Sequence, residues 1–298
     1  MLSGIGDVTD LKPMGIKPIV DLPAVGKNLH DHAFLGNSWL ANSNNTLDNL
    51  HRNNTLAAEA LALWQINGTG PLVLGGSSQF GWLRIPQATD FFQSFGISDP
   101  SPGLTSAHFE LLAINNFISK TVALPTEGHF FSIITVVISP TAPSPGGNVT
   151  LNSTNPFDAP IINPNLLGSP VDLAIMRDAV KAARAFVTAP TWSDYIISEF
   201  GAFANATTEE ALDAYIRSNS DTIDHPVGTV AMGNGVEGAL DSHLRVRGTV
   251  GLRVVDASAF PFIPSAHTQG PTYILAERAA YLVMTGSGDG ATVGGPGG

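Results

Sequence analysis

The sequence contains no cysteine. This absence excludes disulfide bonds, thiolate catalysis and cysteine-ligated metal sites from all 298 residues. Positive charge is also scarce, with 14 Lys and Arg against 25 Asp and Glu and a net charge of −11. Because nucleic acids and anionic lipid surfaces are bound through Lys and Arg, we expect no nucleic acid and no membrane among the partners.

Long apolar runs are missing too, and none reaches the roughly 20 residues that a membrane span requires. The N-terminus, Met1-Leu2-Ser3-Gly4, lacks the basic and apolar regions of a signal peptide. Asn-x-Ser/Thr sequons are nevertheless frequent, and in a chain with few lysines they favour a secreted glycoprotein, although a sequence rich in Asn and Thr yields some by chance. The six sequons begin at Asn44, Asn53, Asn67, Asn148, Asn152 and Asn205.

Several catalytic signatures are absent as well. The sequence has no G-x-S-x-G nucleophile elbow, no P-loop and no G-x-G-x-x-G motif after a strand. A metal-dependent hydrolase remains an open alternative, because His30 and His32 have the H-x-H spacing of metal ligands. His225 or His267 would have to complete that site, and no H-E-x-x-H signature supports it.

The residues that are present favour an α+β fold. Short strand-like segments on short connections indicate a mostly antiparallel sheet, and the apolar run from Phe130 to Ile138 is its expected central strand. Capping residues predict the helices. The expected helices begin near Thr55, after the N-cap Ser169, after a capping box at Thr207, and at Pro271.

Two histidines near the C-terminus stand in unusual surroundings. His225 lies in Asp-His-Pro-Val-Gly-Thr, and His267 follows 42 residues later in Ala-His-Thr-Gln-Gly-Pro. The run from Leu252 to Ser258 predicts a buried strand between them. The spacing alone fits two buried core histidines equally well. A helix start at Pro271, however, leaves free backbone N–H groups beside His267, where negative charge is stabilised and a neutral imidazole can act as a base.

These motifs resemble the glucose–methanol–choline (GMC) family of flavoprotein oxidoreductases, and its aryl-alcohol-oxidase-like branch most of all. The resemblance extends over nearly the whole chain except the glycine-rich tail. Its main carriers are V-G-x-N-L-x-D-H at residues 25–32, H-P-V-G-T-x-x-M-G at 225–233, G-L-R-V-V-D-A-S at 251–258 and A-H-T-Q-G-P-T-Y at 266–273.

The resemblance implies FAD-dependent oxidation of an alcohol to a carbonyl, with O2 or a quinone as electron acceptor. It implies that His225 is the general base for the hydroxyl proton and that His267 is its hydrogen-bond partner. It also places four further residues at the cofactor: Asp256 and Ala257 at the FAD pyrophosphate, and Thr268 and Gln269 at the pyrimidine ring of the flavin.

The resemblance also implies a domain order. Residues 1–35 are expected to be a remnant of the FAD-binding domain, 36–215 the substrate-binding domain, and 216–285 a return segment of the FAD-binding domain that carries the catalytic histidines. Residues 286–298 hold seven glycines and are expected to be disordered.

The family's N-terminal βαβ unit, whose G-x-G-x-x-G motif holds the ADP half of FAD, is absent. We therefore expect a C-terminal fragment that begins at an internal methionine and needs the missing N-terminal half to hold FAD. Asp224 replaces the aromatic residue often found before this histidine in aryl-alcohol oxidases, which argues against an aromatic substrate. The alternative function is an inactive secreted glycoprotein module that keeps only the substrate-domain pocket.

Overall fold

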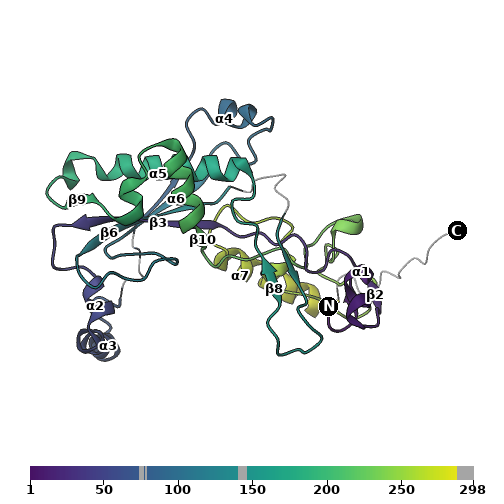
Figure 1. Cartoon of the computed structure of the whole chain (residues 1–298). Helices are drawn as coiled ribbons and strands as arrows, with labels where there is room; N and C mark the ends of the chain where they lie inside the picture. The colour runs from purple at the N-terminus through teal and green to yellow at the C-terminus, as the bar shows by residue number, and fades with distance from the viewer. Residues whose placement is uncertain (74–76, 78, 140–145, 287–298) are drawn as a thin grey trace. The chain divides into compact units, whose positions relative to one another are not determined.

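A computed structural model describes residues 1–73, 77, 79–139 and 146–286 of the chain (Figure 1). The chain divides into two compact units: unit 1 holds residues 1–31, 142–166 and 224–298, and unit 2 holds residues 32–141 and 167–223. Residues 142–166, expected in the substrate domain, thus cluster with unit 1. The assignment of either unit to cofactor or substrate stays a prediction. The expected disordered tail lies, from residue 287 onward, outside the described residues.

Unit 2 is built on a six-stranded antiparallel sheet in the order β10-β3-β6-β5-β4, with β9 also pairing with β3. The predicted α+β class with an antiparallel sheet is therefore confirmed. The strands are β3 (Ala33–Ala41), β4 (Gln79–Leu83), β5 (Phe109–Ile114), β6 (Phe130–Val137), β9 (Ile196–Glu199) and β10 (Asp221–Thr222).

Strand β6 occupies the centre of this sheet, as its apolar, β-branched sequence predicts. All its residues are buried. It pairs with β3 from Phe34↔Val136 to Leu40↔Phe130 and with β5 on its other side. A strand that is buried on both faces carries mostly apolar side chains rather than alternating ones, and this explains the nearly continuous hydrophobic run, which Ser132 and Thr135 interrupt.

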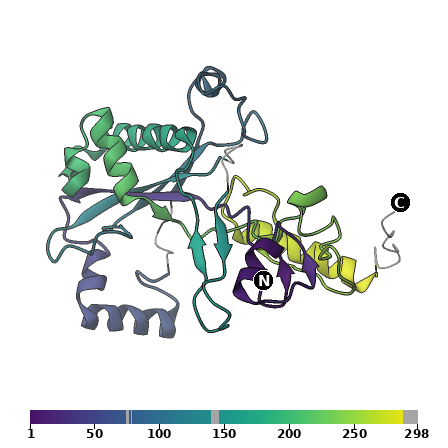
Figure 2. The same cartoon turned by 45° about the vertical axis from the view of Figure 1, so that its right-hand side comes forward.

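Helices α5 (Pro170–Val187) and α6 (Glu209–Asn219) lie on one side of this sheet (Figures 1 and 2). Helix α5 begins as predicted, because the Ser169 side chain accepts a hydrogen bond from the Val171 N–H. The predicted N-cap of α6, Thr207, is wrong by one residue. Thr208 is the N-cap, and its side chain accepts a hydrogen bond from the Ala211 N–H.

The remaining helices of unit 2 are α2 (Asp48–Arg52), α3 (Asn54–Asn67) and α4 (Ala88–Ser94). In both views α2 and α3 lie on the opposite side of the sheet from α5 (Figures 1 and 2). The predicted helix near Thr55 is confirmed as α3, with Asn53 as N-cap and Gly68, at φ +62°, as C-cap. Among the described residues, no helix combines the length and the apolar character needed to cross a membrane.

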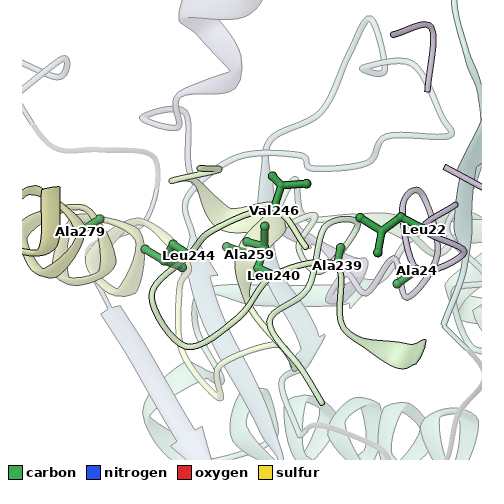
Figure 3. Close-up of a cluster of buried hydrophobic side chains, with 8 residues drawn as sticks. All are labelled: Leu22, Ala24, Ala239, Leu240, Leu244, Val246, Ala259 and Ala279. Carbon is green, nitrogen blue, oxygen red and sulfur yellow. The ribbon is translucent and has the colours of Figure 1, made fainter. Parts of the chain in front are cut away.

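Unit 1 is held together by small apolar side chains rather than by a large sheet. Its main cluster of buried residues lines the loops before helix α7 (Gln269–Met284) and is drawn in Figure 3. Helix α1 (Val8–Leu11) and two short strand pairs complete the unit. These pairs are β1 (Ile5–Gly6) with β2 (Val20–Asp21), and β7 (Asn148–Thr150) with β8 (Ile161–Asn163).

The buried strand predicted from Leu252 to Ser258 is wrong. Within this run Arg253 makes one isolated bridge to Arg245, and the Leu252 side chain is 42% exposed. The Asp256 carboxylate then accepts a hydrogen bond from the Ser258 N–H at 2.8 Å and caps a 3-10 helix, Ala257–Ala259. Aspartate side chains compete in this way with strand hydrogen bonding, so the apolar pattern was misleading.

His108 in unit 2 is fully buried and holds an acid-sensitive contact. Its Nδ1 accepts the Ile85 N–H at 3.0 Å, and its Nε2 donates to Asp99 Oδ1 at 3.1 Å. This pairing requires a neutral ring, and burial lowers the pKa of His108 from its ordinary value of 6.5. Burial tends to raise the pKa of Asp99, but hydrogen bonds from Ser101 and from the His108 ring outweigh it and hold the pKa at about 2.

We expect the thermal unfolding midpoint to fall as the pH drops from about 7 to about 5. In this range His108 takes up a proton in the unfolded chain, whereas its buried ring in the folded chain resists protonation because its pKa is lowered. Stability is therefore lost as the pH falls below 6.5, the ordinary pKa of histidine. Asp99 remains ionised because its pKa is about 2. The variant His108→Gln should show a smaller midpoint change between the two pH values, whereas His51→Gln, at an exposed histidine, should behave as the wild type. Equal pH dependence in His108→Gln and the wild type would contradict this role.

Candidate active site

The two predicted catalytic histidines lie side by side within unit 1. The ring centroids of His225 and His267 are 4.9 Å apart, and the ring planes meet at 78°, an edge-to-face arrangement. Both side chains are half-buried. The structure therefore brings together two imidazoles that are 42 residues apart in the sequence.

The backbone around His225 has an uncommon conformation. Asp224 has φ +68°, in the left-handed region that non-glycine residues rarely adopt. The next peptide is anchored by the Asp31 carboxylate, whose Oδ1 accepts the His225 N–H at 3.0 Å. Gly228 follows at φ +90°, and a Cβ there would lie 2.3 Å from the Asn28 carbonyl oxygen. The His225 loop thus depends on a glycine and on one carboxylate.

The segment 28–31 supports this loop along its length. His30 and Val227 exchange backbone hydrogen bonds of 3.0 and 2.9 Å. The Asn28 amide donates to the carbonyl oxygens of Gly228 and Pro261, both at 3.4 Å, and its Oδ1 lies 2.9 Å from His30 Nε2. Burial lowers the pKa of His30, so this ring is favoured in its neutral form. The motif at residues 25–32 therefore positions the loop that carries His225, a role that its sequence did not reveal.

His267 stands directly before the N-terminus of α7. The helix begins at Gln269, two residues earlier than predicted from Pro271. Its N-cap residue, Thr268, makes no side-chain capping bond, so the first N–H groups have no such partner. No atom lies within 4 Å of a Cβ built on Gly270, so the space above this turn is open. A positive helix end thus lies beside the histidine pair.

A small apolar cluster lies next to the His225 loop and helix α7. Val227, Phe260 and Ile263 are buried together, with Ala257 and Leu275 packed against them. Val227 is the second residue after His225, and Leu275 lies in the second turn of α7. The cluster therefore connects the elements that carry the two rings and limits their movement.

The predicted pyrophosphate residues lie in the same unit. The Ala257 carbonyl accepts the Gly228 N–H at 3.2 Å, which ties the 3-10 helix to the His225 loop. The Ala257 N–H opens that 3-10 helix and has no intrahelical partner. Asp256 is exposed, and its Oδ1 is engaged as the helix cap. The arrangement leaves one backbone donor available to an anionic group at Ala257.

The described residues offer no candidate metal site for the alternative of a metal-dependent hydrolase. Within residues 1–73, 77, 79–139 and 146–286, no group of three or more His, Asp or Glu side chains is placed to hold a metal ion. His30 is instead paired with Asn28, as described above.

Comparisons with known proteins decide the family. The family model described as GMC oxidoreductase matches residues 143–276. A pyranose dehydrogenase of Agaricus xanthodermus is 35% identical over 299 residues, covering 95% of this chain and 47% of that protein. The chain belongs to the GMC oxidoreductase family.

Solved structures agree with this assignment. The formate oxidase of Aspergillus oryzae, in its R554A variant, has a TM-score of 0.87 and 27% identity over 97% of this chain and 52% of its own. A fungal aryl-alcohol oxidase has a TM-score of 0.73 and 25% identity over 96% of this chain and 52% of its own. The chain spans about half the length of the curated relatives it matches and corresponds to the C-terminal part of the GMC fold.

FAD is the cofactor of the GMC family. The residues of this chain fit one part of it. The uncapped start of α7 and the open space at Gly270 suit an electron-rich ring edge, since backbone N–H groups there have no competing cap. The Ala257 N–H is a further free donor for an anion. The sequence has no G-x-G-x-x-G motif to hold the ADP portion.

Proposed function

We propose that this chain carries the catalytic histidines of an FAD-dependent enzyme that oxidises an alcohol to a carbonyl. The observation that carries the proposal is the edge-to-face pair of His225 and His267, 4.9 Å apart, beside an uncapped helix N-terminus. A base, a second hydrogen-bonding ring and a positive helix end are the groups that this reaction requires.

In the proposed reaction the alcohol oxygen is held between the two imidazole rings. A ring nitrogen of His225 takes the hydroxyl proton while the carbinol carbon loses its hydrogen with the bonding electron pair, and the C=O bond forms. When bound, FAD supplies the acceptor for that hydrogen and electron pair, and O2 or a quinone accepts the electrons afterwards. His267 forms a hydrogen bond with the substrate oxygen and fixes its direction. In this proposal the two imidazole rings, both in unit 1, orient the hydroxyl group of the small-molecule alcohol.

We propose that Thr268 and Gln269 lie at the pyrimidine ring of the flavin, and Asp256 and Ala257 at the pyrophosphate. The first turn of α7 would stabilise negative charge on the ring through its free N–H groups. The Ala257 N–H would donate to a pyrophosphate oxygen. Asp256 would act by capping the short helix that presents this N–H, because its own carboxylate is already engaged.

Holding the rest of FAD requires a further partner, and we propose the N-terminal half of the GMC fold. Helix α7 is mostly apolar and has no distinct polar face, a pattern typical of a largely buried helix, yet only Ala279 and Leu282 of its residues are buried. Tyr273 and Ile274 are 67% and 73% exposed. This chain matches 47% of the pyranose dehydrogenase. In this proposal the unmatched part of such a protein, its N-terminal half, covers these side chains.

We further propose that the protein is a secreted glycoprotein. Five of the six sequon asparagines have exposed side chains, and Asn148 in β7 is half-buried. Fungal relatives in this family include the Agaricus pyranose dehydrogenase. Each exposed sequon can carry a glycan without displacing core residues.

The experiment fuses this chain to the N-terminal half of the Agaricus pyranose dehydrogenase and compares the fusion with the chain alone. We expect the fusion to retain FAD through gel filtration and to reduce a dye acceptor when an alcohol or sugar is added. We expect the chain alone to release FAD. A fusion that retains FAD but oxidises none of a panel of sugars and primary alcohols would contradict the enzyme and favour the inactive glycoprotein module.

A further inference from the structure

Helix α3 of unit 2 exposes large apolar side chains to solvent. Leu61, Trp64 and Ile66 are 43%, 48% and 79% exposed. Of the 14 residues of this helix, all of them described, only Ala60 is buried. In both views α3 lies farther from the sheet than α2 does (Figures 1 and 2). Glu59 is the single charged residue of α3. A helix with so few polar groups is typical of a covered position, so the exposed side of α3 needs an occupant.

Two of the Asn-x-Ser/Thr sequons begin at the two ends of this helix. Asn53 is its N-cap, and Asn67 is its last residue, followed by the C-cap Gly68 at φ +62°. Both asparagines and both sequon threonines, Thr55 and Thr69, are exposed. A helix of 14 residues is about 21 Å long. The exposed apolar side chains of α3 therefore lie between two acceptor sites for N-linked glycans.

Both asparagines can carry a glycan without losing a contact of the fold. The Oδ1 atom of Asn53 caps the helix by accepting the N–H of Thr55 at 3.0 Å and of Leu56 at 3.3 Å. A glycan is attached through Nδ2, and this atom makes no hydrogen bond within the described part of the chain. The side chain of Asn67 makes none to the described residues either. Glycosylation thus leaves the helix cap and the backbone unchanged.

Trp64 lies one turn before Asn67 on the same side of α3. Residues three apart in an α-helix are neighbours on its surface, and helical side chains point back over the preceding turn. The Gly68 N–H donates to the Trp64 carbonyl oxygen at 2.8 Å and closes this last turn. Among the described residues, the Trp64 ring contacts no other aromatic ring. A sugar on Asn67 is therefore directed over an indole ring that is open to it.

We propose that Asn67 carries an N-linked glycan whose first sugar stacks on Trp64, and that this glycan and one on Asn53 cover α3 with carbohydrate. In the attachment step, Nδ2 of Asn67 forms a bond to the anomeric carbon of a lipid-linked oligosaccharide. The bond from that carbon to the lipid pyrophosphate breaks, the pyrophosphate leaves, and Nδ2 loses one proton. The C–H bonds of the sugar face carry partial positive charge and lie against the negative face of the indole. The sugar hydroxyl groups remain hydrated.

The same assignment separates α3 from α7, the other helix with exposed apolar side chains. Helix α7 contains no asparagine, so no glycan blocks Tyr273 and Ile274 from a protein partner. A protein that docked on α3, whether a second copy or the N-terminal half of the GMC fold, would have to bury hydrophilic glycans at both ends of the helix. We therefore assign carbohydrate to α3 and leave α7 for the protein partner.

This inference deepens the proposed secreted glycoprotein and rests on it, whereas FAD and the histidine pair take no part in it. The first test expresses the chain in yeast behind a signal peptide and maps its glycopeptides by mass spectrometry, in the medium and in the cell lysate. We expect glycans on Asn53 and Asn67. If either is bare while Asn148, Asn152 or Asn205 carries a glycan, the inference is overturned and the glycoprotein proposal stands. Glycans at none of the sequons would contradict both.

The second test measures acrylamide quenching of tryptophan fluorescence in the glycosylated protein. Asn67→Gln should be quenched more strongly than the wild type, because Trp64 loses the sugar above it. This difference should vanish when both proteins also carry Trp64→Phe. The matched control is Asn205→Gln, which removes an exposed sequon outside α3 and should be quenched as the wild type is. Equal quenching of Asn67→Gln and the wild type would overturn the stacking of the glycan on Trp64.

A third measurement, gel filtration, tests whether the glycans keep α3 free of protein. The double variant Asn53→Gln/Asn67→Gln should self-associate more than Asn205→Gln does, because its exposed apolar side chains are no longer covered. Adding Trp64→Ser to the double variant should reverse this change. Circular dichroism spectra equal to that of the wild type show that the variants are folded. A folded double variant with the elution of Asn205→Gln would overturn the covering role of the glycans.

Discussion

Replacing His225 by alanine is expected to lower kcat/KM for alcohol oxidation by about 10²- to 10⁴-fold in the FAD-loaded fusion. The proton must leave the hydroxyl group as the carbinol hydrogen departs, since otherwise positive charge accumulates on the substrate oxygen. His225, whose ring centroid lies 4.9 Å from that of His267, is the proposed acceptor of that proton. Steady-state kinetics with a dye acceptor measures the effect.

The matched control is His51→Ala, which removes an exposed histidine of unit 2. It should retain wild-type kcat/KM. Both variants should retain bound FAD, because His225 is proposed to act on the proton and not to hold the cofactor. A His225→Ala enzyme with the activity of His51→Ala would exclude His225 as the base.

Replacing Asp48 by alanine is expected to destabilise unit 2 by about 3–5 kcal/mol. Asp48 is fully buried, and its carboxyl oxygens accept the Phe117 N–H at 2.7 Å, the Phe130 N–H at 2.9 Å and the Thr46 hydroxyl at 2.8 Å. Removal leaves two backbone donors without an acceptor in the core. Urea unfolding followed by circular dichroism measures the loss of stability.

Asp194→Ala serves as the control for this prediction, because Asp194 is an exposed aspartate of the same unit. It should change the free energy of unfolding by less than about 0.5 kcal/mol. Asp48→Asn should fall between the two, since one acceptor oxygen remains while the new amide faces a donor. Equal stability of Asp48→Ala and Asp194→Ala would show that the buried carboxyl does not anchor α2 to the sheet.

The starts of α3 and α5 were predictable from sequence because their signals are local. The Ser169 cap and the Asn53 cap each bond to an N–H two residues away, so the sequence itself contains both partners. The central strand β6 was equally visible, since burial on both faces favours a nearly continuous apolar run.

Strand β3 was not predicted, because Gly36, Asn37 and Ser38 interrupt its apolar pattern. Their partners are distant in sequence. The Asn37 amide donates to the Ile133 carbonyl at 3.1 Å, and Ser38 Oγ lies 2.7 Å from Ser132 Oγ. A Cβ on Gly36 would lie 2.2 Å from the Ile118 carbonyl oxygen. These polar residues are compatible with a buried strand only once the sheet has formed.

The candidate site also combines features that the sequence could predict with features that depend on distant contacts. The sequence identified His225 and His267 through their motifs, but it could not give their separation, which depends on the fold of three chain segments in unit 1. The anchoring contact from Asp31 to the His225 N–H joins residues 194 positions apart. The uncommon φ of Asp224 had no local signal either, since aspartate adopts many turn conformations.

The most direct test of the account is anaerobic mixing of the FAD-loaded fusion with a saturating sugar or alcohol, in wild-type and His225→Ala forms. We predict that the wild-type protein loses its oxidised-flavin absorbance within a single turnover and that His225→Ala, with the same FAD content, loses it at least about a hundredfold more slowly. Equal rates of bleaching in the two proteins, or a wild-type flavin that stays oxidised with every sugar and alcohol tried, would contradict the central claim that this histidine pair removes a proton from an alcohol.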